Sequence, residues 1–268
     1  MNYPLPTGAA DSERLDLLDD VYGDATRRIL QQIGAGPDLH VVDLGCGSGT
    51  VSTWLAEQVG SGGSVTGVDL ASDQLRLTEQ RAHDAGLDNV RTVQADVSDT
   101  GLPGATFDLV YCRFVLSHLR DPVSVLREAA RLAGPGGHVV CFEVDVSGLA
   151  SRPETAAYRR LCEVVLAAGH AHGIDYEIGA RLHTLFRTAG LDVTGMDQIH
   201  PLYLGSERKA LWERTFHAVQ QHIVGSGVIT SEEFRALMRE VAAVTSNGLI
   251  AIAQSRLVAC WGRVEQST

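Results

Sequence analysis

The stretch His40–Val51, HVVDLGCGSGTV, decides the fold of this chain. Its first apolar residues predict a short strand, and Asp43 lies near the end of that strand. A turn follows that contains three glycines, which let a ligand approach the backbone closely: Gly45, Gly47 and Gly49. A helical pattern begins at Val51, so the turn places its backbone N–H groups at a helix N-terminus. The stretch therefore predicts a strand–turn–helix unit that binds a ligand.

The residues of the turn restrict which ligand that can be. A dinucleotide fingerprint needs G-x-G-x-x-G, but Thr50 occupies the position of the third glycine. A P-loop needs a lysine, and no Lys or Arg occurs between His40 and Leu75. Asp43 repels phosphate and attracts an ammonium or sulfonium group. The run D-L-G-C-G-S-G resembles motif I of the class I S-adenosylmethionine-dependent methyltransferases, whose cofactor carries a net positive charge.

The composition indicates one globular enzyme. The chain has 268 residues, of which 44% are hydrophobic, and a formal charge of −11 that repels nucleic acids and anionic membranes. The five cysteines show no C-x-x-C spacing, and no apolar run approaches the ~20 residues that span a bilayer. We expect a cytoplasmic protein with reduced cysteines and a small-molecule substrate, with no nucleic-acid or membrane partner.

We also expect one domain over residues 1–268, with N-terminal helices over 1–36 and a cofactor-binding half over 37–145.

Residues 12–33 carry apolar side chains at helical spacing and predict one or two helices before the first strand. The resemblance implies that this N-terminal segment closes over the pocket, which would bring Tyr3, Arg14 and Tyr22 to the ligand. Plain packing of the segment against the sheet edge is the alternative.

Two further strands end in acidic residues. Val65–Val68 predicts the second strand, with Asp69 and Leu70 after it, and Ser72 is expected to cap the next helix, which carries Gln74. A carboxylate at the position of Asp69 can accept hydrogen bonds from both ribose hydroxyls. Val90–Val93 predicts the third strand, and the resemblance implies that Asp96 and the backbone of Val97 contact adenine.

Phe107–Tyr111 predicts the fourth strand, followed by Arg113 and His118. The resemblance places this segment between the methionine part of the cofactor and the substrate. An imidazole there could accept a proton from a hydroxyl or amine during methylation, so His118 is the candidate catalytic base. The alternative is that His118 only shapes the pocket. The resemblance therefore assigns cofactor contacts to Asp43, Gly45, Cys46, Gly47, Gly49, Asp69, Leu70, Gln74, Asp96, Val97, Arg113 and His118.

His138–Phe142 predicts the fifth strand, with Glu143 and Asp145 at its carboxyl end. These carboxylates could hold a substrate amine or act as a base, or they could cap the following loop.

The pattern becomes mainly helical after residue 145. Ser151 and Glu154 predict a capping box, LDVTGMDQIHPLYL predicts a sixth strand, and Arg256–Val264 predicts the last strand, antiparallel in the family. We expect residues 146–268 to supply the substrate side, with a helical cap over about 205–246. One apolar helix around Trp212–Ile223 and a second with a Thr230/Glu233 capping box belong to this cap. Substrate contacts are expected from Tyr3, Tyr22, Glu143, Asp145, His200, Tyr203 and Trp212.

The overall expectation is an α/β, Rossmann-like fold. It has a seven-stranded, mostly parallel sheet with the last strand antiparallel, helices on both faces and a helical cap. His170 and His172 point to different faces of a helix and lack a third ligand with diagnostic spacing, so we expect no metal.

The resemblance implies methyl transfer from S-adenosyl-L-methionine to an O, N or C atom of a small metabolite, with S-adenosyl-L-homocysteine as the other product. The expected acceptor is uncharged or cationic, and specialised metabolism is the expected setting. A cyclisation or rearrangement at the same site, or a non-catalytic cofactor-binding subunit, is the alternative. The sequence leaves the acceptor and the oligomeric state open.

Overall fold

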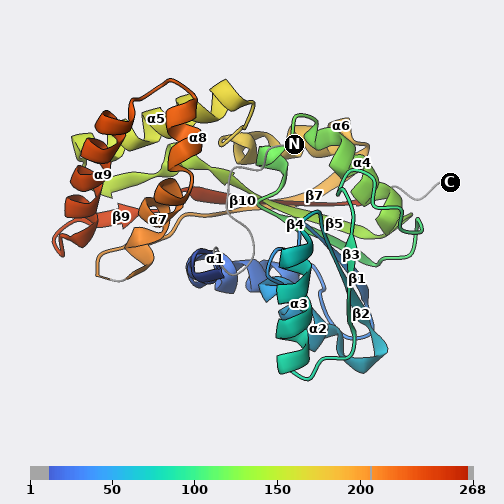
Figure 1. The fold of residues 1–268 in the computed structure, drawn as a ribbon. Helices are drawn as coiled ribbons and strands as arrows, with labels where there is room; N and C mark the ends of the chain where they lie inside the picture. Colours follow the sequence, from blue (N-terminus) through green and yellow to red (C-terminus); the bar gives the residue numbers. More distant parts are fainter. Residues whose placement is uncertain (1–11, 206, 265–268) are drawn as a thin grey trace.

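A seven-stranded sheet forms the centre of the computed structural model, which describes residues 12–205 and 207–264 (Figure 1). Its order is β3-β2-β1-β4-β5-β10-β7, and only β10 runs antiparallel to its neighbours. The predicted fold class is confirmed. The strands are β1 (His40–Leu44), β2 (Ser64–Asp69), β3 (Val90–Gln94), β4 (Leu109–Arg113), β5 (His138–Asp145), β7 (Leu191–Ile199) and β10 (Arg256–Val264).

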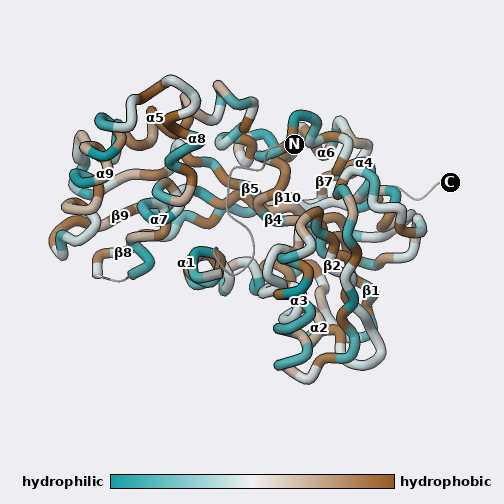
Figure 2. The backbone as a smooth tube through the Cα atoms, viewed as in Figure 1, coloured by the Kyte–Doolittle hydropathy of each residue, from teal (hydrophilic) through white to brown (hydrophobic). Residues whose placement is uncertain are grey.

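Helices cover both faces of this sheet because side chains alternate along the strands. Val41 packs with α1 (Ser12–Gln32) and α2 (Thr50–Val59), whereas its neighbour Val42 packs with α4 (Pro122–Ala133) and α6 (Leu182–Thr188). Helix α3 (Ser72–Asp84) packs beside α2 and against β2 and β3. Figure 2 shows the most hydrophobic backbone in the central strands, between these helical layers.

The helices of the predicted cap, over about 205–246, lie at one end of the molecule together with the earlier helix α5. Figure 1 shows α5 (Ala156–His172), α7 (Leu211–Ala218), α8 (Gln220–Gly225) and α9 (Ser231–Ser246) gathered away from α2 and α3. Helix α1 contacts both α2 and α7, so it joins the two groups. No helix in the described part of the chain is long and apolar enough to cross a membrane.

The structure contains a second sheet under the cap, which the sequence analysis did not predict. The run predicted as one sixth strand is β7 followed by β8 (Leu202–Tyr203), with His200-Pro201 between them. β8 pairs with β9 (Ala251–Ala253), which also pairs with β6 (Ala150–Arg152). The prediction was wrong here because proline interrupts ladder hydrogen bonding and the chain changes sheet.

Strand boundaries also differ from the prediction. β4 begins at Leu109, two residues after the predicted start, because the backbone N–H of Phe107 donates to the carbonyl of Leu132 in α4 and not to β1. β5 continues to Asp145 because β10 pairs with it along that length.

Two predicted helix caps are wrong and one is confirmed. Ser72 is the first residue of α3, and Ala71 stands at the N-cap. Ser151 lies in β6, and the N-cap of α5 is Thr155, whose hydroxyl accepts from the N–H of Tyr158. The Thr230/Glu233 capping box of α9 is confirmed, with both reciprocal hydrogen bonds present. The helix predicted around Trp212–Ile223 is two helices, α7 and α8.

Candidate functional site

A cavity of about 500 Å³ lies at the carboxyl ends of the central strands, where open parallel sheets bind ligands. One part of its wall comes from the glycine turn and the ends of β1 to β4. The other part comes from α1, the segment after β4, and the cap helix α7. The predicted residues on this wall are Arg14, Asp43, Gly45, Cys46, Gly47, Asp69, Leu70, Gln74, Asp96, Val97, Arg113, His118 and Trp212.

The glycine turn is held against β2 by its own backbone. The N–H groups of Gly45 and Cys46 donate to the carbonyl of Val68 at 2.7 and 3.0 Å. Gly49 is the N-cap of α2 and adopts φ 78°, a left-handed conformation that favours glycine, and it lies beside the wall, against Thr78. At Gly47, with φ 54°, the position of a Cβ would meet no atom within 4 Å. The turn thus leaves open space where a ligand can approach the backbone.

Asp43 lies at the floor of the cavity. Its side chain is 2% exposed and accepts a hydrogen bond from the hydroxyl of Ser52 at 2.6 Å. Burial raises the pKa of Asp43 to about 7, although the Ser52 hydrogen bond and nearby Arg113 favour the ionised form. A positively charged ligand would therefore be stabilised here, and would in turn favour the carboxylate.

Asp69 braces the turn from β2. Its two carboxylate oxygens accept from the N–H groups of Gly47 at 3.0 Å and Ala71 at 2.9 Å. Burial raises the pKa of this carboxyl, and the backbone N–H groups counteract the effect. Nearby, the Oε1 atom of Gln74 is buried without a hydrogen-bond partner among the described residues, and Leu70 is 61% exposed. A buried amide oxygen without a partner indicates that a ligand donor belongs beside it.

Asp96 lies at the mouth of the cavity. Its Oδ1 accepts from the hydroxyl and the backbone N–H of Ser98 at 2.7 and 2.9 Å. These hydrogen bonds lower the pKa of Asp96, the side-chain bond more than the backbone one. Asp96 is thus an exposed, ionised acceptor, and Val97 beside it is half-buried.

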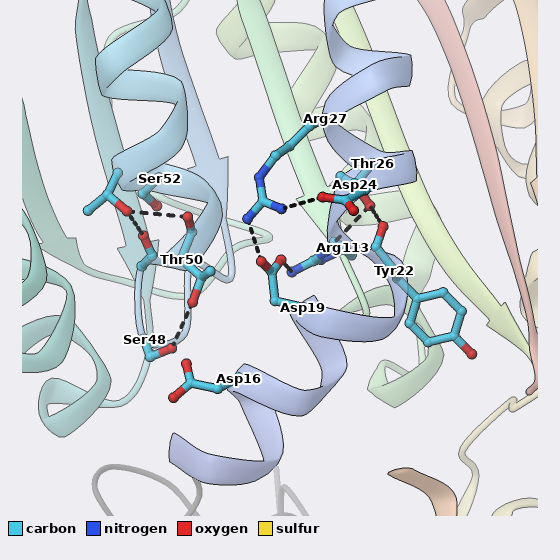
Figure 3. Close-up of polar contacts among 12 residues, drawn as sticks. Asp16, Asp19, Tyr22, Asp24, Thr26, Arg27, Ser48, Thr50, Ser52 and Arg113 are labelled. Atoms are coloured by element: carbon cyan, nitrogen blue, oxygen red, sulfur yellow. Dashed lines mark hydrogen bonds and ion pairs between the residues drawn. The ribbon is translucent and has the colours of Figure 1, made fainter. Parts of the chain in front are cut away.

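Arg113, at the end of β4, connects the cavity to α1. Its guanidinium forms an ion pair with Asp19 at 3.2 Å and donates to the hydroxyl of Thr26 at 3.4 Å (Figure 3). Asp19 also pairs with Arg27. This network fixes the helix that closes one side of the cavity.

His118 lies in the short 3₁₀ helix η3 (Leu116–His118) after β4. Its ring stands edge-on to Tyr176 with centroids 6.3 Å apart. Burial lowers the pKa of His118 to about 4, and the charges of Arg14 and His222 act in the same direction. The imidazole is therefore neutral near pH 7, and the same shift makes it a weaker base than a free imidazole.

Several predicted substrate residues lie off the cavity wall and have partners within the protein. Tyr22 is fully buried, and its hydroxyl donates to the carbonyl of Ser255 at 2.9 Å. Asp145 pairs with Arg256 at 2.5 Å. The Nε2 of His200 lies 3.1 Å from the carbonyl of Gly148. The hydroxyl of Tyr203 donates to the carbonyl of Val21. Glu143 accepts hydrogen bonds from two backbone N–H groups. Tyr3 lies outside the described residues.

Sequence reasoning did not single out several residues of the wall. Tyr111 is 2% exposed, and its hydroxyl has no hydrogen-bond partner among the described residues. It sits opposite Asp43 in the β1–β4 register. A tyrosine inside an apolar strand is usually core, so only its strand neighbour could have suggested a ligand. The other unpredicted wall residues include Leu15, Leu18, Phe114, Ser117, Leu119, Val144, Tyr176, Thr215, Phe216 and Val219.

Residues 12–205 and 207–264 contain no group of three or more His, Cys, Asp or Glu side chains that could hold a metal ion. The ring of His172 instead stacks on His222 with centroids 3.7 Å apart.

The fold and the site agree with the class of protein that the sequence resembles. A seven-stranded sheet of this order, with a glycine turn after β1 and acidic residues at the ends of β1, β2 and β3, agrees with the arrangement that the resemblance to class I S-adenosylmethionine-dependent methyltransferases implied. The buried Gln74 oxygen and Tyr111 hydroxyl, both without partners in the described structure, fit a polar cofactor.

Comparisons with known proteins agree with this class. Residues 42–141 match the methyltransferase domain family. A demethylmenaquinone methyltransferase of Geobacillus sp. (strain WCH70) is 34% identical over 45% of this chain and 49% of its own length. The nocamycin O-methyltransferase of Saccharothrix syringae is 32% identical over 45% of this chain and 43% of its own length. The chain thus spans about half the length of the curated relatives that it matches.

A solved structure extends the likeness to most of the fold. A candidate methyltransferase of Bacillus halodurans C-125 aligns with a TM-score of 0.63 at 19% identity, covering 89% of this chain and 98% of that one. Residues 42–141 thus match the methyltransferase domain, and most of the chain shares the fold of that solved structure.

Proposed function

We propose that this chain transfers a methyl group from S-adenosylmethionine to an O, N or C atom of a small, apolar molecule. The observation that carries the proposal is one continuous cavity with two kinds of wall. Acidic residues and the glycine turn form the first, and mainly apolar side chains from α1, the segment after β4 and α7 form the second. A cofactor and an apolar acceptor can therefore meet inside it.

The polar wall suits each part of the cofactor. Asp43 supplies a buried carboxylate for a cationic amino acid group, and Asp69 supplies a partly buried one for ribose hydroxyls. Asp96 is an exposed acceptor for the adenine amino group. The sulfonium of the bound cofactor supplies an activated methyl group, so the protein's main task is to orient the acceptor and exclude water.

The apolar wall restricts the acceptor. Trp212 and Phe216 of α7 stack with ring centroids 5.5 Å apart, and both line the cavity. The described residues on this side of the wall include no carboxylate, whereas Asp43, Asp69 and Asp96 lie on the polar side. A neutral acceptor therefore fits better than the cationic one that the sequence left open. The names of both curated relatives refer to small-molecule methylation, which supports a small acceptor.

His118 is the proposed proton acceptor when the nucleophile is a hydroxyl. Its neutral form would take the proton as the oxygen attacks the methyl carbon. We expect His118→Asn to lower kcat by about 10²-fold or more on such an acceptor. The affinity for S-adenosylhomocysteine, measured by calorimetry, should stay within about threefold. A kcat within about threefold of wild type would show that His118 only shapes the pocket.

Product analysis tests the proposal directly. The protein is incubated with S-adenosylmethionine and a panel of apolar phenols, enols and carboxylic acids, and both products are followed by mass spectrometry. We expect S-adenosylhomocysteine to accumulate together with an acceptor that has gained one methyl group. Conversion of an acceptor without S-adenosylhomocysteine would instead indicate a cyclisation or rearrangement. Cofactor binding without any turnover over the panel would favour a non-catalytic subunit.

A further inference from the structure

Glu143 occupies an unusual place at the carboxyl end of β5. It is 0% exposed and lies just past the last residue pair between β4 and β5, Arg113 with Phe142. On its other side it pairs with Val258 of β10. A carboxylate buried at this depth requires hydrogen bonds that satisfy it.

Two consecutive backbone N–H groups supply hydrogen bonds to one oxygen of Glu143, whereas its Oε2 atom is buried without a partner among the described residues. The Oε1 atom of Glu143 accepts from Val115 at 2.7 Å and from Leu116 at 2.6 Å. Both donors lie at the start of η3, where a helical turn has N–H groups without internal partners. One carboxylate oxygen therefore closes the first turn of the segment that follows β4.

That segment leaves β4 in a conformation that its own sequence does not favour. Phe114 has φ 58°, in the left-handed region, which disfavours a residue with a bulky side chain. Its backbone N–H donates to the carbonyl of Phe142, directly before Glu143. The hydrogen bonds from β5 hold the backbone on both sides of this left-handed residue.

The same segment forms the junction between the two walls of the cavity. Phe114, Val115, Ser117 and His118 all line it. Val115 also packs over the glycine turn, because a Cβ added at Gly45 would lie 2.4 Å from its Cγ2 atom. The position of this short segment thus sets the distance between the glycine turn and His118.

We infer that Glu143 is a positioning residue: its carboxylate fixes the Val115–His118 backbone, and through it the places of His118 and Val115 beside the transferred methyl group. This inference rests on the proposed function. Glu143 lies behind the segment and off the described cavity wall, so it acts through the backbone. Its effect should therefore fall mainly on the orientation of the acceptor, and less on cofactor affinity.

Two substitutions test whether Glu143 acts as a hydrogen-bond acceptor or only fills space. Glu143→Gln keeps an oxygen that can accept from both N–H groups, whereas Glu143→Leu keeps the approximate volume and removes the acceptor. Glu128→Leu is the matched control. Glu128 is 7% exposed and likewise accepts a backbone N–H, that of Thr100 at 3.0 Å, but it lies on α4 outside the cavity wall.

The first readout is the imidazole of His118, which needs no turnover. The protein has ten histidines, so the His118 signal is identified by its loss in His118→Asn during NMR titration. The charged or titratable groups near the ring are Arg14, His222 and Tyr176, and none of them is altered by the variants. We expect Glu143→Leu to raise the pKa of His118 by about one unit or more toward its usual value, because water reaches the loosened segment. Glu143→Gln and Glu128→Leu should leave it unchanged.

The second readout is kinetic. We expect Glu143→Leu to lower kcat about 10- to 100-fold, because small displacements of reacting groups have large effects on rate. Its affinity for S-adenosylhomocysteine should stay within about fivefold of wild type, and Glu143→Gln should recover most of kcat. If Glu143→Leu lowers Tm as Glu128→Leu does but leaves kcat and the His118 titration at wild-type values, the inference is overturned. Absence of cofactor binding by the wild-type protein would instead overturn the proposed function.

Discussion

Asp43, Asp69 and Asp96 lie at or just beyond the carboxyl ends of β1, β2 and β3, yet their surroundings differ. Asp43 is buried beside one hydroxyl, Asp69 is held by two backbone N–H groups, and Asp96 is exposed. Burial raises the pKa of the first two, and hydrogen bonds from Ser98 lower that of Asp96. Sequence spacing placed all three carboxylates at one crevice, but their ionisation depends on packing that the sequence does not show.

Asp43 should make cofactor affinity depend on pH. Its pKa is about 7, and only its ionised form attracts a cationic amino acid group. We expect the affinity for S-adenosylhomocysteine, measured by calorimetry, to increase as the pH rises from about 6 to about 8. Asp43→Asn should bind more weakly and without this rise, whereas Asp88→Asn, an exposed control in a turn, should follow wild type. A rise of the same size in Asp43→Asn would assign the pH dependence to another group.

Tyr111 should hold the amino acid end of the cofactor. Its buried hydroxyl lacks a partner among the described residues, and it faces the charges of Arg113 and Asp43. We expect Tyr111→Phe to weaken S-adenosylhomocysteine binding about tenfold, the usual effect of one hydrogen bond to a charged group. Binding of methylthioadenosine, which lacks the amino acid, should not change. Equal weakening of both ligands would show that the substitution disturbs the whole cavity.

At the scale of elements, local chemistry predicted some boundaries well and failed where distant parts of the chain decide them. The Thr230/Glu233 box lies within one helix turn, so the sequence contains all of its partners. Ser151 resembles a cap in the sequence, but pairing with β9 draws it into a strand. The segment after β4 was expected near the ligand, but its conformation depends on β5. The N–H of Phe114, which has a positive φ, donates to the carbonyl of Phe142, and Glu143 accepts from Val115 and Leu116.

Alanine substitutions at Gly45 and at Gly47 in the glycine turn should lower the stability of the protein by different amounts. Gly45 and Gly47 both have positive φ, so alanine is strained at each. At Gly45 the new Cβ would also lie 2.4 Å from Val115 Cγ2, whereas at Gly47 it would meet no protein atom within 4 Å. We expect Gly45→Ala to lower Tm more than Gly47→Ala does.

Val115→Ala supplies the test of that contact. The double variant Gly45→Ala/Val115→Ala should recover part of the Tm lost in Gly45→Ala, because the clashing methyl group is gone. Additive losses in the double variant would show that backbone strain alone explains the effect. Thermal denaturation followed by circular dichroism measures both.

At the scale of the whole molecule, the order of strands and helices could be predicted because each βα unit repeats the same pattern. The seven strands of the main sheet were each predicted, with boundaries that shifted by a few residues. The small sheet β6-β9-β8 was not, because its strands are two or three residues long and come from distant parts of the chain. The substrate side was predicted poorly for the same reason: α1, α7 and Tyr176 meet only in the folded protein.

Buried carboxyls should make the protein less stable as the pH rises through the weakly acid range. The pKa of Asp43 is raised from 3.8 to about 7 and that of Glu143 from 4.5 to about 7. Between these values the folded protein keeps protons that the unfolded chain has released, so the free energy of unfolding falls with rising pH. Each group contributes a slope of up to about 1.4 kcal/mol per pH unit. Urea denaturation should show a smaller fall for Asp43→Asn than for wild type, and equal falls would contradict the assignment.

The central claim is that the crevice at the ends of β1, β2 and β3 selects a nucleoside joined to an amino acid that carries an ammonium group. Calorimetric titration of the wild-type protein with S-adenosylhomocysteine, and separately with NADH, tests it most directly. We expect saturable binding of one S-adenosylhomocysteine per chain, and NADH binding weaker by at least about tenfold, because Asp43 repels the pyrophosphate. No heat with S-adenosylhomocysteine, or tighter binding of NADH, would contradict the claim.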